Sequence, residues 1–262
     1  MKKNFWTARL KTILIVAVVL AVIVAVILGI TSGASFGENV VGTILSPIRT
    51  GIAAIDRQAE RYYNYIFGYE ALKAENRRAA DYVIGSAHYV GLDFHGRTVA
   101  VDGDPALLRQ YVHEECGGDG LELARRYFDV HVSGLLRDRP DVIGHFDLVR
   151  KYALSEGILD ENSAEYRRLA LEALEKAFSC GGVLEVNTGA IARGYRDDPY
   201  PTAELLTAWR EMGGRATITS DCHDAAKLDC AFERAVELLR QTGYRTVLRL
   251  GTGEERWQEE KL

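Results

Sequence analysis

An unbroken apolar stretch lies near the N-terminus. Eighteen residues, from Ile13 to Ile30, carry no polar side chain and are rich in Val, Ile, Leu and Ala. At about 1.5 Å of rise per residue, such a helix approaches the ~30 Å hydrocarbon core of a membrane, whereas the apolar part of a secretory signal usually runs ~7 to 15 residues. The pattern predicts one transmembrane helix. The alternative is a signal peptide cleaved within residues 31–35.

Basic residues around this stretch predict its orientation. Four precede it, and only Arg49 falls in the next twenty residues; the four are Lys2, Lys3, Arg9 and Lys11. Positive charge is retained on the cytoplasmic side. We therefore expect a single-pass membrane location, with the N-terminus in the cytoplasm and everything after the helix outside.

A short heptad pattern follows the apolar stretch. Apolar side chains recur at alternating three- and four-residue steps, at Ile52, Ile55, Ala59, Tyr62, Ile66 and Tyr69. Such spacing is typical of a coiled coil. Two interpretations stay open: a parallel homodimer through residues 52–76, or an amphipathic helix packed on something nearby.

The rest of the chain alternates between two periodicities. Short apolar runs bounded by Gly, Asp, Ser or Asn predict strands at 82–84, 142–143, 183–186, 216–219 and 246–250. Helical stretches between them lie at 121–136, 164–178, 203–212 and 228–242. This order predicts the α/β fold class, with a parallel sheet or barrel covered by helices, whose chemistry gathers at the carboxyl ends of the strands.

Charge divides the chain near Ala80 and Asp81. Residues 1–80 carry a net charge of +5, which leaves −10 for residues 81–262. An acidic domain is a poor nucleic-acid binder, so we expect no nucleic-acid partner. The four cysteines are scattered without a CxxC pair, which predicts neither a zinc knuckle nor a disulfide framework and favours a reducing compartment.

Histidine and aspartate follow three of the predicted strands. His88 follows the first strand, His145 and Asp147 follow the second, and Asp221 and His223 follow the fourth. These side chains are expected to converge on one rim, where imidazole and carboxylate ligands suit zinc, manganese or iron. The remaining histidines lack this placement and are expected on loops or helix surfaces: His95, His113 and His131.

Residues 81–262 resemble histidinol-phosphatases of the polymerase and histidinol phosphatase (PHP) superfamily. The similar motifs are Asp81-Tyr-Val-Ile-Gly-Ser-Ala-His88, Gly144-His-Phe-Asp147, Glu185-Val-Asn-Thr-Gly-Ala190 and Ser220-Asp-Cys-His223. The resemblance implies a distorted seven-stranded (β/α) barrel with a trinuclear metal cluster. It also implies hydrolysis of L-histidinol phosphate, a small-molecule phosphate monoester, in histidine biosynthesis by a cytoplasmic enzyme.

The resemblance also implies roles for individual residues. His88 and His145 would bind one metal, Asp221 and His223 would help to hold the others, and no catalytic side chain beyond the ligands is expected. Arg193 would grip the substrate phosphate, with a solvated loop arginine as the alternative. Asn187 would orient the substrate or only cap the following turn.

The preceding segment resembles the N-terminal part of the rod shape-determining protein MreC. The resemblance rests on the basic tail, the single span, Ser46-Pro47 and the sequence from Tyr65 to Asn76. The expected organisation is a cytoplasmic tail (1–12), a transmembrane helix (13–30), an MreC-like amphipathic segment (31–80) and a partial PHP domain (81–262).

Both resemblances are incomplete. PHP phosphatases begin with a His-x-His strand end, whereas this chain has no histidine before His88. About two barrel strands and half of the ligands are therefore expected to be missing. The family also supplies a bridging glutamate shortly before the position of Asp81, and neither Glu70 nor Glu75 is expected to replace it. Three hypotheses follow: an impaired phosphatase or one dependent on a second chain, a membrane-anchored MreC-like scaffold with a passive tail, or a fusion of unrelated genes by deletion or assembly error.

Overall fold

The computed structural model describes residues 77, 79–93, 96–251 and 255–262. The chain divides into two compact units, residues 1–68 and residues 69–262, and the described residues all belong to the second. The predicted membrane span, the heptad segment at 52–76, the MreC-like motifs and His95 lie outside the described residues. The homodimer and the MreC resemblance therefore stay predictions from sequence.

The membrane location is corrected. Within the part of the chain that the structure describes, no helix is long and apolar enough to cross a membrane. This finding contradicts the predicted single-pass location.

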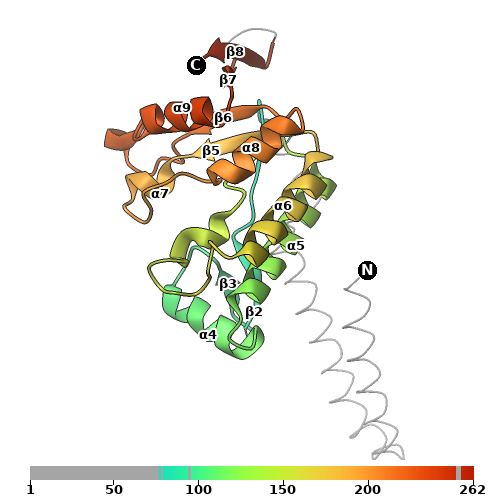
Figure 1. Ribbon diagram of the computed structural model, residues 1–262, viewed down its shortest axis with the longest axis vertical. Helices are drawn as coiled ribbons and strands as arrows, with labels where there is room; N and C mark the ends of the chain where they lie inside the picture. The colour runs from blue at the N-terminus through green and yellow to red at the C-terminus, as the bar shows by residue number, and fades with distance from the viewer. Residues whose placement is uncertain (1–76, 78, 94–95, 252–254) are drawn as a thin grey trace, which may run out of the picture. The chain divides into compact units, whose positions relative to one another are not determined.

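A six-stranded sheet forms the centre of the described unit (Figure 1). Its order is β1 (Ile84–Gly85), β4 (Val142–Ile143), β5 (Val183–Asn187), β6 (Ala216–Thr219), β7 (Thr246–Leu250) and β8 (Trp257–Lys261). The first five strands pair in parallel, and β8 returns antiparallel to β7. The sheet curls into a half-barrel, which fits the predicted partial α/β barrel.

A small layer is inserted between β1 and β4. It contains the antiparallel pair β2 (Tyr89–Leu92) and β3 (Thr98–Ala100), followed by helix α4 (Pro105–Glu115). Asp104 caps α4 by accepting the Ala106 N–H at 2.8 Å. Figure 1 shows this layer beside the start of α5, away from β6 and β7.

The remaining helices alternate with the strands. They are α5 (Gly120–Asp138), α6 (Ala164–Phe178), α7 (Gly189–Ala192), α8 (Ala203–Glu211) and α9 (Phe232–Gln241), with 3-10 turns η1 (Leu148–Tyr152) and η2 (Ala225–Lys227). Asp119, Ser163 and Thr202 cap α5, α6 and α8. Helix α9 begins four residues later than predicted because Ala231 adopts a left-handed φ of 62°, which separates it from η2.

The core lies where α5, α6 and α8 pack against the sheet. Strands β4 and β5 are buried along their whole lengths, as expected for strands covered on both faces. Trp209 of α8 is fully buried, packs edge-on against Phe178 and donates its indole N–H to the Arg215 carbonyl at 3.0 Å. All four cysteines are unpaired thiols, as the scattered spacing predicted.

His131 belongs to this core rather than to a helix surface, so that prediction was wrong. Its ring is buried against Phe146 and Tyr127, and its Nδ1 lies 3.3 Å from the Phe146 carbonyl oxygen. His131 lies one turn from the buried Tyr127 and Leu135 on the apolar face of α5, and the surface prediction overlooked this periodicity. His113, by contrast, is exposed on α4, as predicted.

Burial of His131 predicts acid sensitivity. Burial lowers the pKa of His131 to about 3, so the unfolded chain takes up this proton near pH 6.5 whereas the folded chain does not. This contribution to the free energy of unfolding is fully present above about pH 6.5 and is lost as the pH falls toward 3. Between pH 6 and pH 5 the free energy of unfolding should drop by about 1 kcal/mol more in the wild type than in His131→Gln.

Urea unfolding at both pH values measures this difference, with the exposed His113→Gln as the matched control. An equal pH dependence in the wild type and His131→Gln would contradict the assignment.

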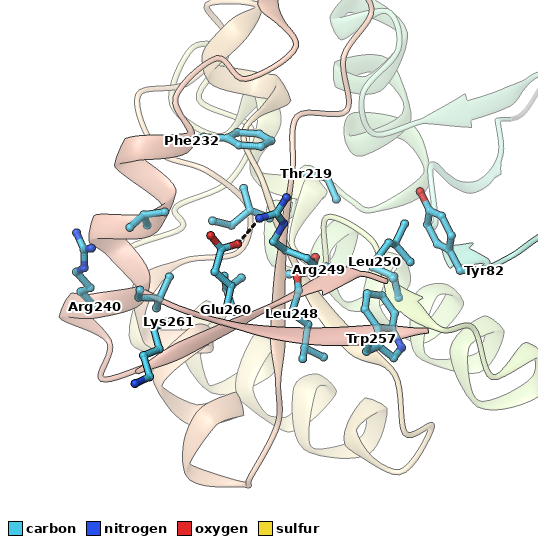
Figure 2. Close-up of a pocket in the computed structure, with 16 residues that line it drawn as sticks. Tyr82, Thr219, Phe232, Arg240, Leu248, Arg249, Leu250, Trp257, Glu260 and Lys261 are labelled. Carbon is cyan, nitrogen blue, oxygen red and sulfur yellow. Dashed lines mark hydrogen bonds and ion pairs between the residues drawn. The ribbon is translucent and has the colours of Figure 1, made fainter. Parts of the chain in front are cut away.

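A hollow of about 710 Å³ adjoins strands β6, β7 and β8. It is lined by side chains of β6, β7, β8 and α9 together with Tyr82, and an Arg249–Glu260 ion pair of 2.7 Å crosses its wall (Figure 2). Ile84 of β1 is 40% exposed, and within the described residues β1 pairs with a strand on only one side. None of the predicted metal ligands lines this hollow, so it is distinct from the site described next.

Candidate functional site

His88 and His145 meet at the carboxyl ends of adjacent strands. The paired strands β1 and β4 end in register, and the Gly144 N–H donates to the Gly85 carbonyl oxygen at 2.9 Å. The two imidazole rings lie 4.8 Å apart between centroids, edge to face. The strand-end pattern in the sequence thus predicted a real juxtaposition.

Gly144 permits this approach of the two strands. A Cβ there would overlap Ser86 Oγ and come within 2.9 Å of Ile84 Cγ2. His145 follows with a φ of 20°, at the edge of the left-handed region, and its N–H donates to Glu185 Oε2 at 2.6 Å. The strained backbone is therefore fixed by a buried carboxylate from the neighbouring strand.

Glu185 organises three strand ends. Besides the His145 N–H it accepts the Thr219 hydroxyl at 2.5 Å and the Asn187 amide at 3.1 Å, which ties β4, β5 and β6 together. Burial raises the pKa of Glu185, and these hydrogen bonds act against the rise. Asn187 in turn accepts the Gly189 N–H at 2.9 Å, which places its side chain across the start of α7.

Asp102 orients His88. Its Oδ2 lies 3.0 Å from His88 Nδ1, and this hydrogen bond raises the pKa of His88. The contact leaves Nε2 as the nitrogen available to a ligand, the arrangement by which carboxylates orient metal-binding imidazoles. Sequence reasoning missed Asp102. In Val101-Asp102-Gly103-Asp104 no local pattern distinguishes Asp102 from Asp104, the residue that caps α4.

His145 has an unsatisfied nitrogen. Its ring is buried, and within the described residues Nδ1 has no hydrogen-bond partner. Burial, together with the nearby His88, lowers the pKa of His145 to about 4, so the imidazole is neutral at pH 7. A neutral imidazole with a free nitrogen is the form that binds metals.

Asp221 approaches the same imidazoles from β6. Its backbone adopts a left-handed φ of 44°, and its carboxylate acts electrostatically on both His88 and His145. Arg193 holds it, donating to the Asp221 carbonyl at 2.8 Å and to Oδ2 at 3.1 Å. His223 lies 3.5 Å from the other carboxylate oxygen, and its side chain is 73% exposed.

Asp147 does not join this rim, contrary to the sequence prediction. It is fully buried and pairs with Arg150 at 2.8 Å, while its Oδ2 also accepts the Thr202 N–H at 3.0 Å. Side chains two residues apart on a strand point the same way, but this does not hold for His145 and Asp147. The left-handed turn at His145 and the start of η1 change the direction of the chain between them.

Arg150 lies at the centre of a buried ionic cluster behind the rim. It contacts Asp147, Glu161 and Asp198, and Arg196 contacts the last two as well as the Arg150 carbonyl oxygen. The cluster joins the segment that follows His145 to the segment that follows Arg193. The two chain segments that flank the rim are therefore held by the same charges.

The fit of this rim to a metal ion is partial. His88 offers Nε2, His145 offers a buried unpartnered nitrogen, and Asp221 offers a carboxylate that Arg193 already engages. Within the described ranges, however, no group of three histidine, cysteine, aspartate or glutamate side chains is arranged to hold a metal ion. The described residues alone therefore do not form a complete metal centre.

Comparison with known proteins finds several relatives of this chain. No protein-family model matches the chain. A probable histidinol-phosphatase of Schizosaccharomyces pombe is 28% identical over 186 residues, 70% of this chain and 58% of the relative. One of Deinococcus radiodurans is 33% identical over 171 residues, 64% of this chain and 56% of the relative. The chain has histidinol-phosphatase homologues.

The similarity extends to a third curated protein. The histidinol-phosphatase of Saccharomyces cerevisiae is 23% identical, and the match covers 62% of this chain and 52% of the relative. The chain thus spans little more than half the length of the histidinol-phosphatases that it matches. The homology supports the phosphatase resemblance of residues 81–262, whereas the MreC resemblance of residues 1–80 rests on its motifs alone.

Proposed function

We propose that this chain is a phosphomonoesterase of the histidinol-phosphatase type that acts on L-histidinol phosphate at the rim formed by His88, His145 and Asp221. The observation that carries the proposal is the pair of imidazoles at adjacent strand ends, one held by Asp102 and the other with a free buried nitrogen. The homologues support the substrate class.

His88, His145 and Asp221, with His223 beside them, are the residues that would hold divalent zinc, manganese or iron. A bound cation of this kind lowers the pKa of its water and neutralises phosphoryl oxygens, which phosphate monoester hydrolysis requires. The chain's own contribution is to fix the imidazoles through Asp102 and Glu185. Arg193, whose guanidinium lies beside Asp221, would bind the phosphate through its fork of N–H donors.

Low activity is part of the proposal. The described residues do not complete a three-ligand group, and Arg193 competes with any cation for Asp221. We therefore expect turnover by this chain alone to lie well below that of a full-length relative, and to rise only if another polypeptide segment completes the ligand set.

Phosphate release by the purified full chain tests the function. With Mn²⁺ or Zn²⁺ present we expect slow hydrolysis of L-histidinol phosphate, faster than that of glycerol phosphate, and its loss after treatment with a chelator. The Deinococcus radiodurans relative assayed in parallel supplies the benchmark rate. No release with either metal would overturn the proposed function, and a rate equal to the benchmark would overturn the proposed impairment.

A further inference from the structure

Lys151 lies beside the rim, close enough to Arg193 for the two positive charges to interact. It belongs to η1, six residues after His145, and its Nζ donates to the Asp102 carbonyl oxygen at 2.7 Å. The same ammonium lies 4.1 Å from the centre of the Tyr195 ring and 4.9 Å from that of Tyr152. The half-buried lysine thus touches the residue that orients His88 and the loop that carries Arg193.

Lys151 forms no ion pair with a carboxylate among the described residues. Among the residues that the structure describes, no carboxylate lies within ion-pair distance of its Nζ. The carboxylate with the largest electrostatic effect on Lys151 is that of Asp102, which already forms a hydrogen bond with His88. Arg193 adds a second positive charge, and burial together with Arg193 lowers the pKa of Lys151.

Two aromatic faces hold the ammonium in place. Tyr152 donates its hydroxyl to the Gly103 carbonyl at 2.8 Å, and its ring meets that of Tyr195 edge to face, 6.3 Å away. Cation–π contact stabilises a lysine without neutralising its charge. One of the three ammonium protons is used by the Asp102 carbonyl, so others remain for an incoming acceptor.

We infer that Lys151 is a second cationic anchor for the phosphate group and binds it together with Arg193. Lys151 acts on His88 from beside Asp102, and Arg193 holds Asp221, which acts on the same imidazole. These two positive charges match a dianion placed against the imidazole pair. The inference rests on the proposed function, because it names how the same site holds the anionic part of its substrate.

Binding of inorganic phosphate to the full chain, followed by calorimetry, tests the assignment. We expect Lys151→Gln to weaken binding by about tenfold, in line with the loss of one charge-assisted hydrogen bond, and to reduce the salt dependence of affinity. Lys151→Arg, which keeps the charge, should stay within about threefold of the wild type.

Lys176→Gln is the matched control. Lys176 is exposed in the last turn of α6, at the amino end of β5 and thus opposite the strand ends that form the rim, and its replacement removes the same charge. It should leave phosphate affinity unchanged. If Lys151→Gln does not fold, as circular dichroism would show, Lys151→Arg with unchanged affinity and Tyr195→Leu with weakened affinity would support the same assignment.

Wild-type affinity in Lys151→Gln, or an equal loss in Lys176→Gln, would overturn the lysine assignment whatever the turnover. The proposed function fails separately: phosphate that binds in a lysine-dependent manner, without any hydrolysis of L-histidinol phosphate, would overturn the activity and leave the anion site in place.

Discussion

Replacing Arg150 with methionine is expected to lower the free energy of unfolding by about 3–5 kcal/mol, as when one partner of a buried ion pair is removed. The Arg150 side chain is only 2% exposed, and it contacts Asp147 and Glu161, which are buried with it. Methionine fills much of the same volume but leaves these carboxylates without their shared cation. The loss would also loosen the two walls of the rim, because Arg150 and Arg196 join them.

Arg168→Met supplies the comparison within the same fold. Arg168 lies exposed on α6 and pairs with Glu172 one turn later, so its removal should change stability by less than about 0.5 kcal/mol. Urea unfolding of both variants near pH 7 measures the two effects. Similar small losses in both would show that the buried cluster contributes little beyond an ordinary surface pair.

Replacing His145 with alanine is expected to reduce hydrolysis of L-histidinol phosphate by more than about a hundredfold, since loss of an outer-shell partner alone costs 10- to 100-fold in metal sites. His145 supplies the buried nitrogen without a partner, and its ring lies against that of His88. Affinity for Mn²⁺ or Zn²⁺ should fall together with the rate.

His113→Ala is the control for this prediction, because His113 is an exposed histidine on α4. Steady-state rates, metal titration and the thermal midpoint of both variants should be measured together. Activity retained in His145→Ala would show that the imidazole pair is not the reaction centre, even if L-histidinol phosphate is hydrolysed elsewhere on the chain.

The sequence predicted three strands with their observed bounds, β4, β6 and β7. Each is a short apolar run bounded by turn residues, which is the pattern that predicts a strand. Strand β8 escaped prediction because Trp257-Gln-Glu-Glu-Lys261 is a polar, solvent-facing edge. The small layer of β2, β3 and α4 was also missed.

The site was partly predictable for a related reason. The rule that parallel strands end at one edge identified His88, His145 and Asp221, which the structure brings together. Asp102 and Lys151 lie on turns whose position depends on the packing of the inserted layer and η1, and no local pattern indicates that. Asp147 was misplaced because a left-handed turn cancels the strand alternation on which the prediction relied.

The antiparallel return of β8 makes the two margins of the sheet unequal. At one margin, charged and polar side chains of β8 face solvent, a pattern that discourages further strand pairing. At the other, β1 presents the exposed apolar side chain of Ile84 a few residues before His88. Any strand that extended the sheet at this margin would therefore lie beside the imidazoles, and pairing at β1 would act directly on the surroundings of His88.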